Sequence, residues 1–383
     1  MYKIANFVLD EKFIDAIITN HQILKSTNIS HNYIFINENS SYPFKFIRNS
    51  NYIKIISPKE LLNHLNVFKY NAVFIHGLYS FPVKLISNIH PSIKVFWFAW
   101  GYDLYELPHK KPFIPIELYH ERTKEIIKNS NKVFCNIFQK YIDFFNGYLD
   151  IIYYYKALYR VDYFSGIIPN EYTLIMFYNK RFKAKKVQYS YINQDSFKTI
   201  NNEEGLLKGN NIIIGNSADP TNNHIDIFEH LKYYKLDSKK IIVPLSYSGN
   251  KEYIDAICKY GNDLFKENFI PLLTFMPYEE YYNLINSCSI AIFFHERQQA
   301  LGNVIASFIN GCKVFLSKTS PLYIYLKSKN LIVYTVQEHL TKEELNTKLS
   351  YNEICHNRKI LNNIYGEQAY MNNINNIYNL IKE

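Results

Sequence analysis

Short apolar runs alternate with segments of helical periodicity along this chain of 383 residues, and they do so in two separate series. Such alternation predicts parallel sheets covered by helices on both faces, because parallel neighbours need a crossover connection. The expected strands of the first series are Ile4–Leu9, Tyr33–Ile36, Ala72–Ile75, Val95–Phe98, Lys132–Asn136 and Leu174–Phe177. Those of the second are Asn211–Ile214, Lys240–Pro244, Ile270–Leu273, Ile290–Phe294, Val314–Leu316 and Ile332–Tyr334.

Helical periodicity fills the intervals between these strands. The expected helices are Phe13–Leu24, Pro58–His64, Pro82–Asn88, Ile116–Asn129, Gln139–Phe145, His224–Leu231, Lys251–Phe265, Tyr278–Ser287, Val304–Ile309, Thr341–Ser350 and Asn352–Leu380. A polar stretch around Asn201–Gly205 has the composition of a boundary loop. We therefore expect an α/β domain over residues 1–200, a second over 205–345, and a C-terminal helix over 350–383 that returns to the first domain.

Composition and charge narrow the class of protein. Hydrophobic content of 48% and charged content of 20% are typical of a globular chain. A net charge of +9 favours anionic partners such as nucleotides or acidic lipids, and the absence of an Arg-rich tract or nucleic-acid motif argues against nucleic acid. The five Cys form no Cys-x-x-Cys pair, which predicts reduced thiols in a cytosolic protein and no zinc site.

No stretch of the sequence has the roughly 20 uncharged apolar residues of a membrane span, and Asp10, Glu11 and Lys12 interrupt the N-terminal apolar run. We expect a soluble or peripheral protein. The aromatic and basic segment Asp150–Phe164 has two interpretations. It is either an aromatic core helix or a membrane-surface segment with Lys156 and Arg160 at the headgroups.

The segment Cys288–Leu322 carries the most informative polar turn of the chain. An apolar strand leads into His-Glu-Arg-Gln-Gln at residues 295–299, Gly302 follows, and a helix then ends at Asn310-Gly311. Such a turn faces a ligand at the carboxyl end of the sheet, where Arg297 and a helix N-terminus suit a diphosphate. The alternative is an ordinary solvated loop. Four consecutive polar side chains directly after a buried strand favour a ligand-binding loop over this alternative.

Two further polar loops are expected at the same edge. Gly215–His224 follows the first strand of the second series, and its Gly permits a tight turn while Ser217 or Thr221 caps the next helix. Pro244–Asn250 ends the following strand in the same way. On spacing alone, each is equally well an ordinary capped loop. Met276–Tyr281 is a candidate wall for a nucleotide base, or simply a helix that begins at Pro277.

The first series offers two candidate catalytic groups. His76 follows a strand beside Gly77, and Asp103 follows the next strand in the sequence Trp-Gly-Tyr-Asp at residues 100–103. Activating a sugar hydroxyl needs a carboxylate or imidazole within hydrogen-bond reach. The structural alternative is that Asp103 caps its loop and His76 packs on a neighbour. No Asp-x-Asp pair follows a strand, so the sequence does not call for a catalytic divalent metal, and we expect no cofactor.

Four motifs, in order, resemble the 4-alpha-L-fucosyltransferase family, glycosyltransferase family 56. They are Trp100–Tyr105, Gly215–His224, Val243–Tyr247 and Arg297–Gly302, within roughly residues 70–345. The family pattern often has Gly where this chain has Ala218 and Ala300. The resemblance implies a GT-B fold, in which two doubly wound Rossmann-type domains face a cleft. It also implies an enzyme on the cytoplasmic face of the bacterial inner membrane.

The reaction implied is transfer of a 4-acetamido-4,6-dideoxy-galactose from a TDP-sugar to an undecaprenyl-diphosphate-linked saccharide in surface polysaccharide synthesis. Two alternatives are a GT-B transferase of lipopolysaccharide or capsule synthesis that uses another nucleotide sugar, and a non-catalytic sugar- or nucleotide-binding module. The candidate catalytic residues are Asp103 and His76. The candidate donor-binding residues are Gly215, Asn216, Ser217, Asp219, Ser246, Tyr247, Glu296, Arg297, Gln298, Gln299, Gly302 and Ser320.

Overall fold

A computed structural model describes the chain except for residues 12, 25–27, 79–80, 82, 107–111, 131–151, 193–208, 235, 237–238 and 275. The chain divides into two compact units. Unit 1 comprises Met1–Pro115, Cys135–Gln194 and Tyr365–Glu383, and unit 2 comprises Ile116–Phe134 and Asp195–Ile364. The expected strand Lys132–Asn136, the expected helix Gln139–Phe145, the boundary loop Asn201–Gly205 and Cys135 lie outside the described residues.

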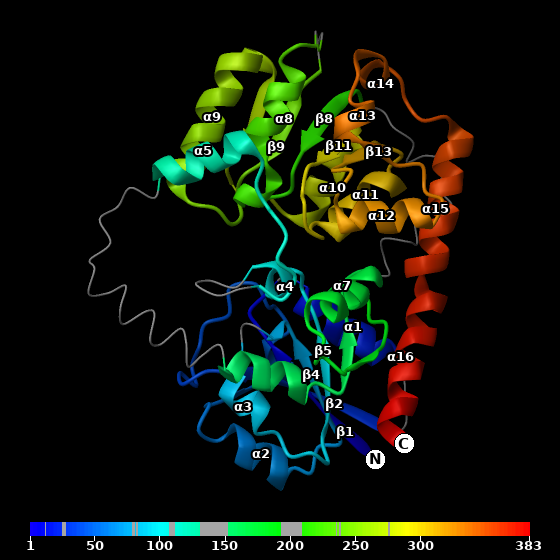
Figure 1. The fold of residues 1–383 in the computed structure, drawn as a ribbon. Coiled ribbons are helices and arrows are strands. Elements are labelled where there is room, and N and C mark those ends of the chain that lie inside the picture. The colour runs from blue at the N-terminus through cyan, green and yellow to red at the C-terminus, as the bar shows by residue number, and fades with distance from the viewer. Residues whose placement is uncertain are drawn as a thin grey trace. The chain divides into compact units, whose positions relative to one another are not determined.

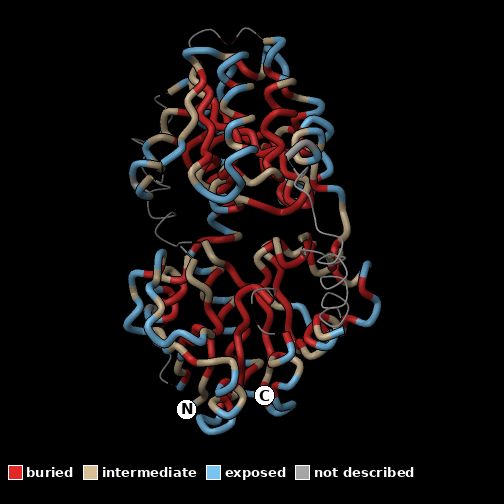
Figure 2. The backbone as a smooth tube through the Cα atoms, turned by 90° about the vertical axis from the view of Figure 1, so that its left-hand side faces the viewer, coloured by how far each residue is buried: buried red, intermediate tan, exposed pale blue. Residues whose placement is uncertain are grey.

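Unit 1 is built on a seven-stranded sheet in which every described pairing is parallel, with the order β3-β2-β1-β4-β5-β6-β7. Its strands are β1 (Tyr2–Val8), β2 (Ile29–Ile36), β3 (Ile53–Ile56), β4 (Ala72–His76), β5 (Lys94–Phe98), β6 (Tyr163–Ser165) and β7 (Lys185–Lys186). The central strands are buried on both faces, as in a covered parallel sheet (Figure 2).

Helices and a 3₁₀ turn connect the strands of unit 1 (Figure 1). They are α1 (Ile14–Ile23), the turn Ser50–Tyr52, α2 (Leu61–Val67), α3 (Val83–Ser87), α4 (Tyr102–Tyr105), a helix over residues 152–160, and α7 (Asn170–Tyr178). The segment Leu174–Phe177, predicted as a strand, lies inside α7, so that prediction was wrong. A short apolar run cannot distinguish strand from helix, and the Pro-Asn-Glu that precedes it at residues 169–171 starts a helix here.

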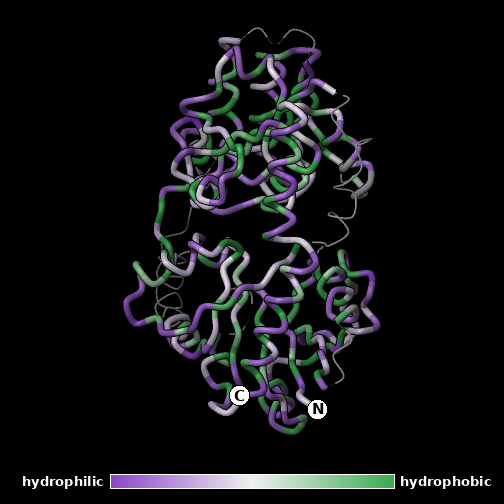
Figure 3. The backbone as a smooth tube through the Cα atoms, turned by 90° about the vertical axis from the view of Figure 1, so that its right-hand side faces the viewer, coloured by the Kyte–Doolittle hydropathy of each residue, from purple (hydrophilic) through white to green (hydrophobic). Residues whose placement is uncertain are grey.

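Unit 2 is built on a six-stranded parallel sheet with the order β10-β9-β8-β11-β12-β13. Its strands are β8 (Asn211–Ile214), β9 (Ile241–Pro244), β10 (Phe269–Leu272), β11 (Cys288–Phe293), β12 (Lys313–Leu316) and β13 (Tyr334–Thr335). In both units the strands are predominantly hydrophobic along the tube, while many of the turns are hydrophilic (Figure 3). The predicted α/β class with two Rossmann-like sheets is confirmed.

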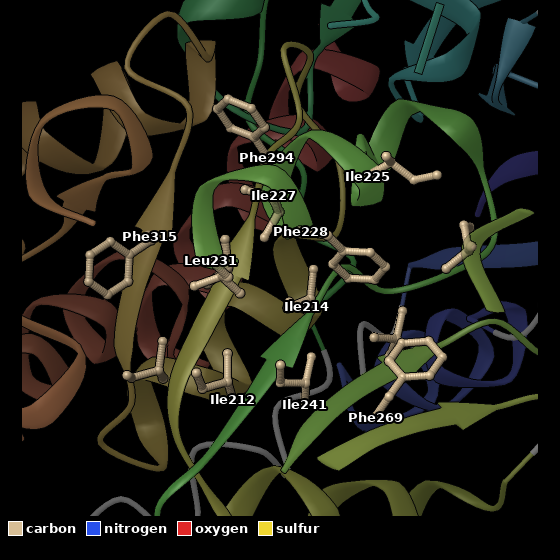
Figure 4. Close-up of a cluster of buried hydrophobic side chains, with 14 of the residues drawn as sticks. Ile212, Ile214, Ile225, Ile227, Phe228, Leu231, Ile241, Phe269, Phe294 and Phe315 are labelled. Carbon is tan, nitrogen blue, oxygen red and sulfur yellow. The ribbon is translucent and has the colours of Figure 1, made fainter. Parts of the chain in front are cut away.

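Helices cover both faces of the second sheet. They are α5 (Glu121–Ser130), α8 (His224–Leu231), α9 (Lys251–Phe265), α10 (Tyr278–Asn286), α11 (Leu301–Ile309), α12 (Pro321–Ser328), α13 (Val336–His339), α14 (Lys342–Asn346) and α15 (Tyr351–Tyr365), with 3₁₀ turns at Pro220–Asn222 and Lys266–Asn268. Side chains of α8 meet those of β8, β9 and β10 in one hydrophobic cluster that contains Phe228, Ile212, Ile241 and Phe269 (Figure 4). Hydrophobic burial of this kind holds the helix on the sheet.

Helix α5 belongs to unit 2, although the sequence prediction placed residues 116–129 in the first domain. The reason is a side chain of α8. The Asp226 carboxylate accepts hydrogen bonds from the backbone N–H groups of Arg122 (3.0 Å) and Thr123 (3.1 Å), and from the Thr123 hydroxyl (2.6 Å). It therefore satisfies donors at the start of α5, which no helical partner can satisfy.

The expected single helix Asn352–Leu380 is two helices, α15 and α16 (Glu367–Lys382), which meet at Gly366. They lie in different units. In α15, Arg358 Nε donates to the carbonyl of Ile309 at the end of α11 (2.8 Å). The buried face of α16 packs in the cluster of unit 1 that contains Phe74, Phe96 and Ile4. Gly in a helical pattern is the usual place for such an interruption.

Candidate functional site

The second sheet has a topological switch point between β8 and β11. The chain winds outward from β8 through β9 to β10, then returns to β11 beside β8 and winds the other way to β13. Helices α8 and α9 lie on one side of the sheet, and α10 to α12 on the other (Figure 1). In open α/β sheets, ligands bind at the carboxyl ends of the two strands at such a point. A ligand of unit 2 is therefore expected at the loops after β8 and β11.

The loop after β8 is folded around the side chain of Asn222. Gly215 has a φ of +70°, and a Cβ there would lie 2.6 Å from Asn222 Oδ1. That oxygen accepts from the backbone N–H of Asn216 (2.9 Å) and from His295 Nε2 (2.8 Å), while Asn222 Nδ2 donates to Ser217 Oγ (3.3 Å). A buried amide thus joins the ends of β8 and β11, and only Gly fits beside it.

Asp219 connects this loop to its neighbours. Its carboxylate accepts from the N–H of Thr221 (3.0 Å) and from the hydroxyl of Ser248 in the loop after β9 (3.3 Å). The Thr221 hydroxyl lies 2.6 Å from Gln299 Oε1 in the loop after β11. In addition, Gln299 Nε2 donates to Asn216 Oδ1 (3.3 Å). The predicted residues Asn216, Asp219 and Gln299 are therefore brought together in one hydrogen-bonded cluster.

The loop after β9 contributes an exposed aromatic ring. Tyr247 is 38% exposed, Ser246 is half-buried, and the Tyr247 carbonyl accepts from the N–H of Ala218 (2.8 Å). Gly249 is required here, because a Cβ at this position would lie 2.3 Å from the carbonyl oxygen of Ala218. The two predicted loops therefore touch through their backbones and leave the Tyr247 ring at the surface of unit 2.

Glu296 is held by three side chains. Its Oε1 accepts from His120 Nε2 (2.7 Å) and from the hydroxyl of Ser317 (2.6 Å), and its Oε2 accepts from the hydroxyl of Thr319 (2.5 Å). The His120 ring stacks on Phe294 with centroids 4.0 Å apart. Burial would raise the pKa of Glu296, but these hydrogen bonds outweigh it and lower the pKa below its usual value. Glu296 is therefore a carboxylate that fixes the shape of this loop.

Arg297 follows at once and is almost completely buried, at 7% exposure. Its Nη1 donates to the carbonyl of Gln298 (3.0 Å), which turns the guanidinium back onto its own loop. Burial, followed by the charge of Arg297, holds the pKa of the neighbouring His295 well below its usual value. His295 is thus neutral, and Arg297 is the positive charge of this loop. Gln298 is also buried, at 3% exposure.

Helix α11 begins directly after this loop. Ala300 is in the left-handed region with a φ of +58°, and the first intrahelical bond of the turn runs from the N–H of Val304 to the carbonyl of Ala300. No side chain caps the helix within the described part of the chain. The N–H groups of the first turn, at residues 301–303, are those that a helix leaves available to an anion. Gly302 is exposed, and a Cβ there would contact nothing, so its small size is not needed for the fold.

Ser320 has a structural role. Its hydroxyl accepts from the N–H of Leu322 (3.3 Å) as the N-cap of α12, and it is 2% exposed. The capping contact gives this hydroxyl a role in the fold, and its part in donor binding stays a prediction. Its neighbours Ser317 and Thr319 are the hydroxyls from this loop that reach Glu296.

Sequence reasoning did not find His120 and Asn223. Asn223 has a φ of +52°, and its side chain joins three segments: Nδ2 donates to the carbonyls of Leu118 (3.2 Å) and Phe294 (3.0 Å), and Oδ1 accepts from the N–H of His120 (2.9 Å). The Asn-Asn-His that follows Thr221 was the available signal for Asn223. Nothing in the sequence links His120 to Glu296, which lies 176 positions away.

In unit 1 the two candidate catalytic residues are buried. Asp103 has no exposed surface, and its carboxylate accepts from Trp97 Nε1 (2.8 Å) and from the N–H groups of Leu78 (3.0 Å) and Trp100 (2.8 Å). Burial raises the pKa of Asp103 to about 6, against the opposing effect of these donors. A carboxylate enclosed in this way fixes the loops after β4 and β5. The structural alternative, in which Asp103 caps its loop, matches this arrangement, and the role of general base stays a prediction.

His76 lies at the end of β4 with no exposed surface, and its Nδ1 is 2.8 Å from the hydroxyl of Tyr191. Burial, with a smaller contribution from His31, lowers the pKa of His76 to about 3. It is neutral and enclosed, as in the structural alternative. Glu171 at the start of α7 is a second buried carboxyl in this unit, and burial raises its pKa to about 7.

Within the described ranges, no group of three or more His, Cys, Asp or Glu side chains is arranged to hold a metal ion. None of the described helices has the length and hydropathy of a membrane-spanning segment. Cys258, Cys288, Cys312 and Cys355 are free thiols, of which Cys288 and Cys312 are buried.

Solved structures of low sequence identity share this fold. A glycosyltransferase from Rickettsia africae matches with 14% identity and a TM-score of 0.64, over 100% of this chain and 99% of that one. The Anabaena protein HepE, solved with UDP and glucose, matches with 9% identity and a TM-score of 0.63 over 99% and 100%. The lipopolysaccharide outer core galactosyltransferase WaaB matches with 11% identity and a TM-score of 0.60 over 98% and 99%.

The model of the family described as 4-alpha-L-fucosyltransferase, glycosyl transferase group 56, matches residues 161–370. This range covers more than half of the chain, including every loop described above at the carboxyl edge of the second sheet. The fold is GT-B, with two Rossmann-like sheets. The chain belongs to the 4-alpha-L-fucosyltransferase family, glycosyltransferase group 56, and is a glycosyltransferase.

Proposed function

We propose that this glycosyltransferase transfers a deoxyamino sugar of the N-acetylfucosamine type from a TDP-sugar to an undecaprenyl-diphosphate-linked saccharide. The place of action would be the cytoplasmic face of a bacterial inner membrane, in surface polysaccharide synthesis. One observation carries the donor half of the proposal: a buried guanidinium, Arg297, lies in the loop between β11 and the uncapped N-terminus of α11, at the switch point.

The chemistry needs a cation at this place. In the transfer, the acceptor oxygen forms a bond to the anomeric carbon, and the bond from that carbon to the diphosphate oxygen breaks. The proton of the acceptor hydroxyl would pass to a general base, the role predicted for Asp103. The leaving nucleoside diphosphate gains negative charge. Arg297 would stabilise that charge by paired N–H···O bonds, and the N–H groups of residues 301–303 would contribute further donors. The enzyme would then need no metal ion for this step.

The remaining donor contacts follow from the cluster around Asn222. Asn216, Asp219 and Gln299 lie in the hydrogen-bonded network beside the switch point, and Tyr247 is exposed beside it. We assign the ribose and sugar hydroxyls to the three polar side chains, and the face of the thymine base to Tyr247. Glu296 and His120 would position Arg297 through the shape of the loop.

The donor nucleotide separates this proposal from its main alternative, a transferase that uses another nucleotide sugar. We expect TDP to raise the melting temperature more than UDP or GDP at equal concentration. A nucleotide at about 100 times its Kd stabilises the native state by about 2.7 kcal/mol. Differential scanning fluorimetry with the three nucleoside diphosphates measures this. Stabilisation by GDP alone would rule out the thymidine assignment, and a larger shift with UDP would favour the alternative donor.

Arg297→Ala should lower the rate of transfer by a factor of about 10² to 10³, as expected for the loss of one preorganised donor at a developing charge. Arg297→Lys should recover part of the rate, because the charge returns without the paired geometry. The matched control is Arg122→Ala, at an exposed arginine of the same unit. Initial rates would be measured on protein whose melting temperature matches the wild type. Full activity of folded Arg297→Ala would contradict the assignment.

His120 and Glu296 should act as one unit. In a double-mutant cycle with His120→Ala and Glu296→Ala, we expect a coupling of about 0.5 to 3 kcal/mol in the transition-state free energy from kcat/KM. The control cycle uses the exposed pair Arg122 and Glu125, whose coupling should stay below about 1 kcal/mol in the free energy of unfolding and be absent from kcat/KM. If the effects of His120→Ala and Glu296→Ala on kcat/KM simply add, His120 has no positioning role.

A further inference from the structure

The strongest unassigned feature is a surface of unit 1 formed by the end of α7, the turn after it and the edge strand β7. It combines two exposed aromatic rings with five cations, and we refer to it as the α7–β7 surface. Its members are Phe177, Tyr178, Lys180, Arg181, Lys183, Lys185 and Lys186. From this combination we infer that the α7–β7 surface docks on an anionic lipid bilayer. The inference deepens the proposed function, since it rests on a lipid-linked acceptor for its purpose.

The exposed rings are the first part of the argument. Phe177 is 63% exposed and Tyr178 is 42% exposed, and the two rings meet edge to face at 5.0 Å. They follow Ile175, the buried apolar side chain of the same helix. Exposed aromatic rings next to each other suit the boundary between lipid headgroups and acyl chains.

The cations are the second part. All five are exposed, and no carboxylate in the described part of the chain forms an ion pair with any of them. The sequence contains no Asp or Glu between residues 172 and 194. Several lysines elsewhere are paired, among them Lys124, Lys232 and Lys313. A cluster of positive charges without paired carboxylates is attracted to an anionic surface.

Local packing holds these groups on one continuous surface. The Tyr172 hydroxyl of α7 donates to the carbonyl of Ala184 (3.1 Å), and Lys186 Nζ lies 5.9 Å from the centroid of the Tyr172 ring. Lys180 Nζ lies 4.8 Å from the centroid of the Phe177 ring. Between the lysines, Phe182 and Ala184 are buried, so the backbone is anchored while the charged side chains point outward. Lysines protect sheet edges in many proteins, but edge protection does not account for the exposed rings.

For residues 150–164 the sequence left two interpretations, a core helix and a membrane-surface segment, and one of the two cations expected at the headgroups, Arg160, is engaged within unit 1. Arg160 donates to Asp162 Oδ2 (2.9 Å) and to the carbonyls of Ile89 (3.0 Å), His90 (2.9 Å) and Ile93 (2.6 Å), and its side chain is 14% exposed. Its guanidinium is therefore engaged inside unit 1. Lys156 is exposed and lies over the Tyr153 ring at 5.3 Å.

The test is sedimentation of the full-length protein with vesicles of phosphatidylglycerol and phosphatidylethanolamine, compared with pure phosphatidylcholine vesicles. Each cation near an anionic surface contributes about a fivefold factor to binding. The double variant Lys180→Glu, Lys183→Glu should therefore bind at least about 25-fold more weakly. Phe177→Ser with Tyr178→Ser should lower binding by about tenfold, and the remaining binding should become more sensitive to salt.

The matched control is Lys259→Glu with Lys327→Glu, two exposed lysines of unit 2 that give the same change in net charge. It should lose less than about threefold at 0.15 M salt. All the variants replace exposed side chains, and equal melting temperatures would verify their folding. Equal losses in the control and the Lys180/Lys183 variant, or equal binding of the wild type to phosphatidylcholine, would overturn the inference. The inference would also be overturned if the Lys180/Lys183 variant bound RNA more weakly than the wild type but bound anionic vesicles equally well.

Transfer to a water-soluble acceptor analogue separates this inference from the proposed function. Normal vesicle binding without transfer from a TDP-sugar contradicts the function and leaves the docking surface standing. Normal transfer by a wild-type protein that does not bind anionic vesicles contradicts the docking surface alone.

Discussion

The candidate site depends on the hydrogen bonds that the side-chain amide of Asn222 makes. This side chain is completely buried, and its amide accepts from the ends of both β8 and β11 while it donates to Ser217 and to the carbonyl of Asp219. A buried amide without these partners would cost about 1 to 3 kcal/mol, so the two loops must keep their shape for the amide to remain satisfied. Gly215 makes room for it. Hydrogen bonds thereby hold the loops after β8 and β11 in place without a bound ligand.

Further hydrogen bonds connect this amide to the rest of the candidate site through neighbouring side chains. Asn223 joins the segment before α5 to Phe294, and His120 in that segment then reaches Glu296. Glu296 is fixed on its other side by Ser317 and Thr319 after β12. Arg297 is therefore carried on a loop supported from three strands. Preorganisation of this kind is what makes a buried cation effective on a developing charge.

The sequence was sufficient for the parts of the fold that depend on local pattern. The strand Asn211–Ile214 and the helices His224–Leu231 and Lys251–Phe265 have the bounds that periodicity predicted. The polar loops of the candidate site were predicted for the same reason, since each follows an apolar strand. Prediction failed where long-range contacts decide. His120 pairs with Glu296, 176 positions away in the sequence, and the enclosure of Asp103 depends in part on the N–H of Leu78, 25 positions away.

Family and fold make the chain a GT-B glycosyltransferase, and we propose that the loops at the carboxyl edge of the second sheet hold its donor. The most direct test is an experimental structure with bound TDP. The account predicts the diphosphate within hydrogen-bond distance of the Arg297 guanidinium and of the N–H groups at the start of α11. A diphosphate bound anywhere else on the sheet, or on unit 1, would contradict it.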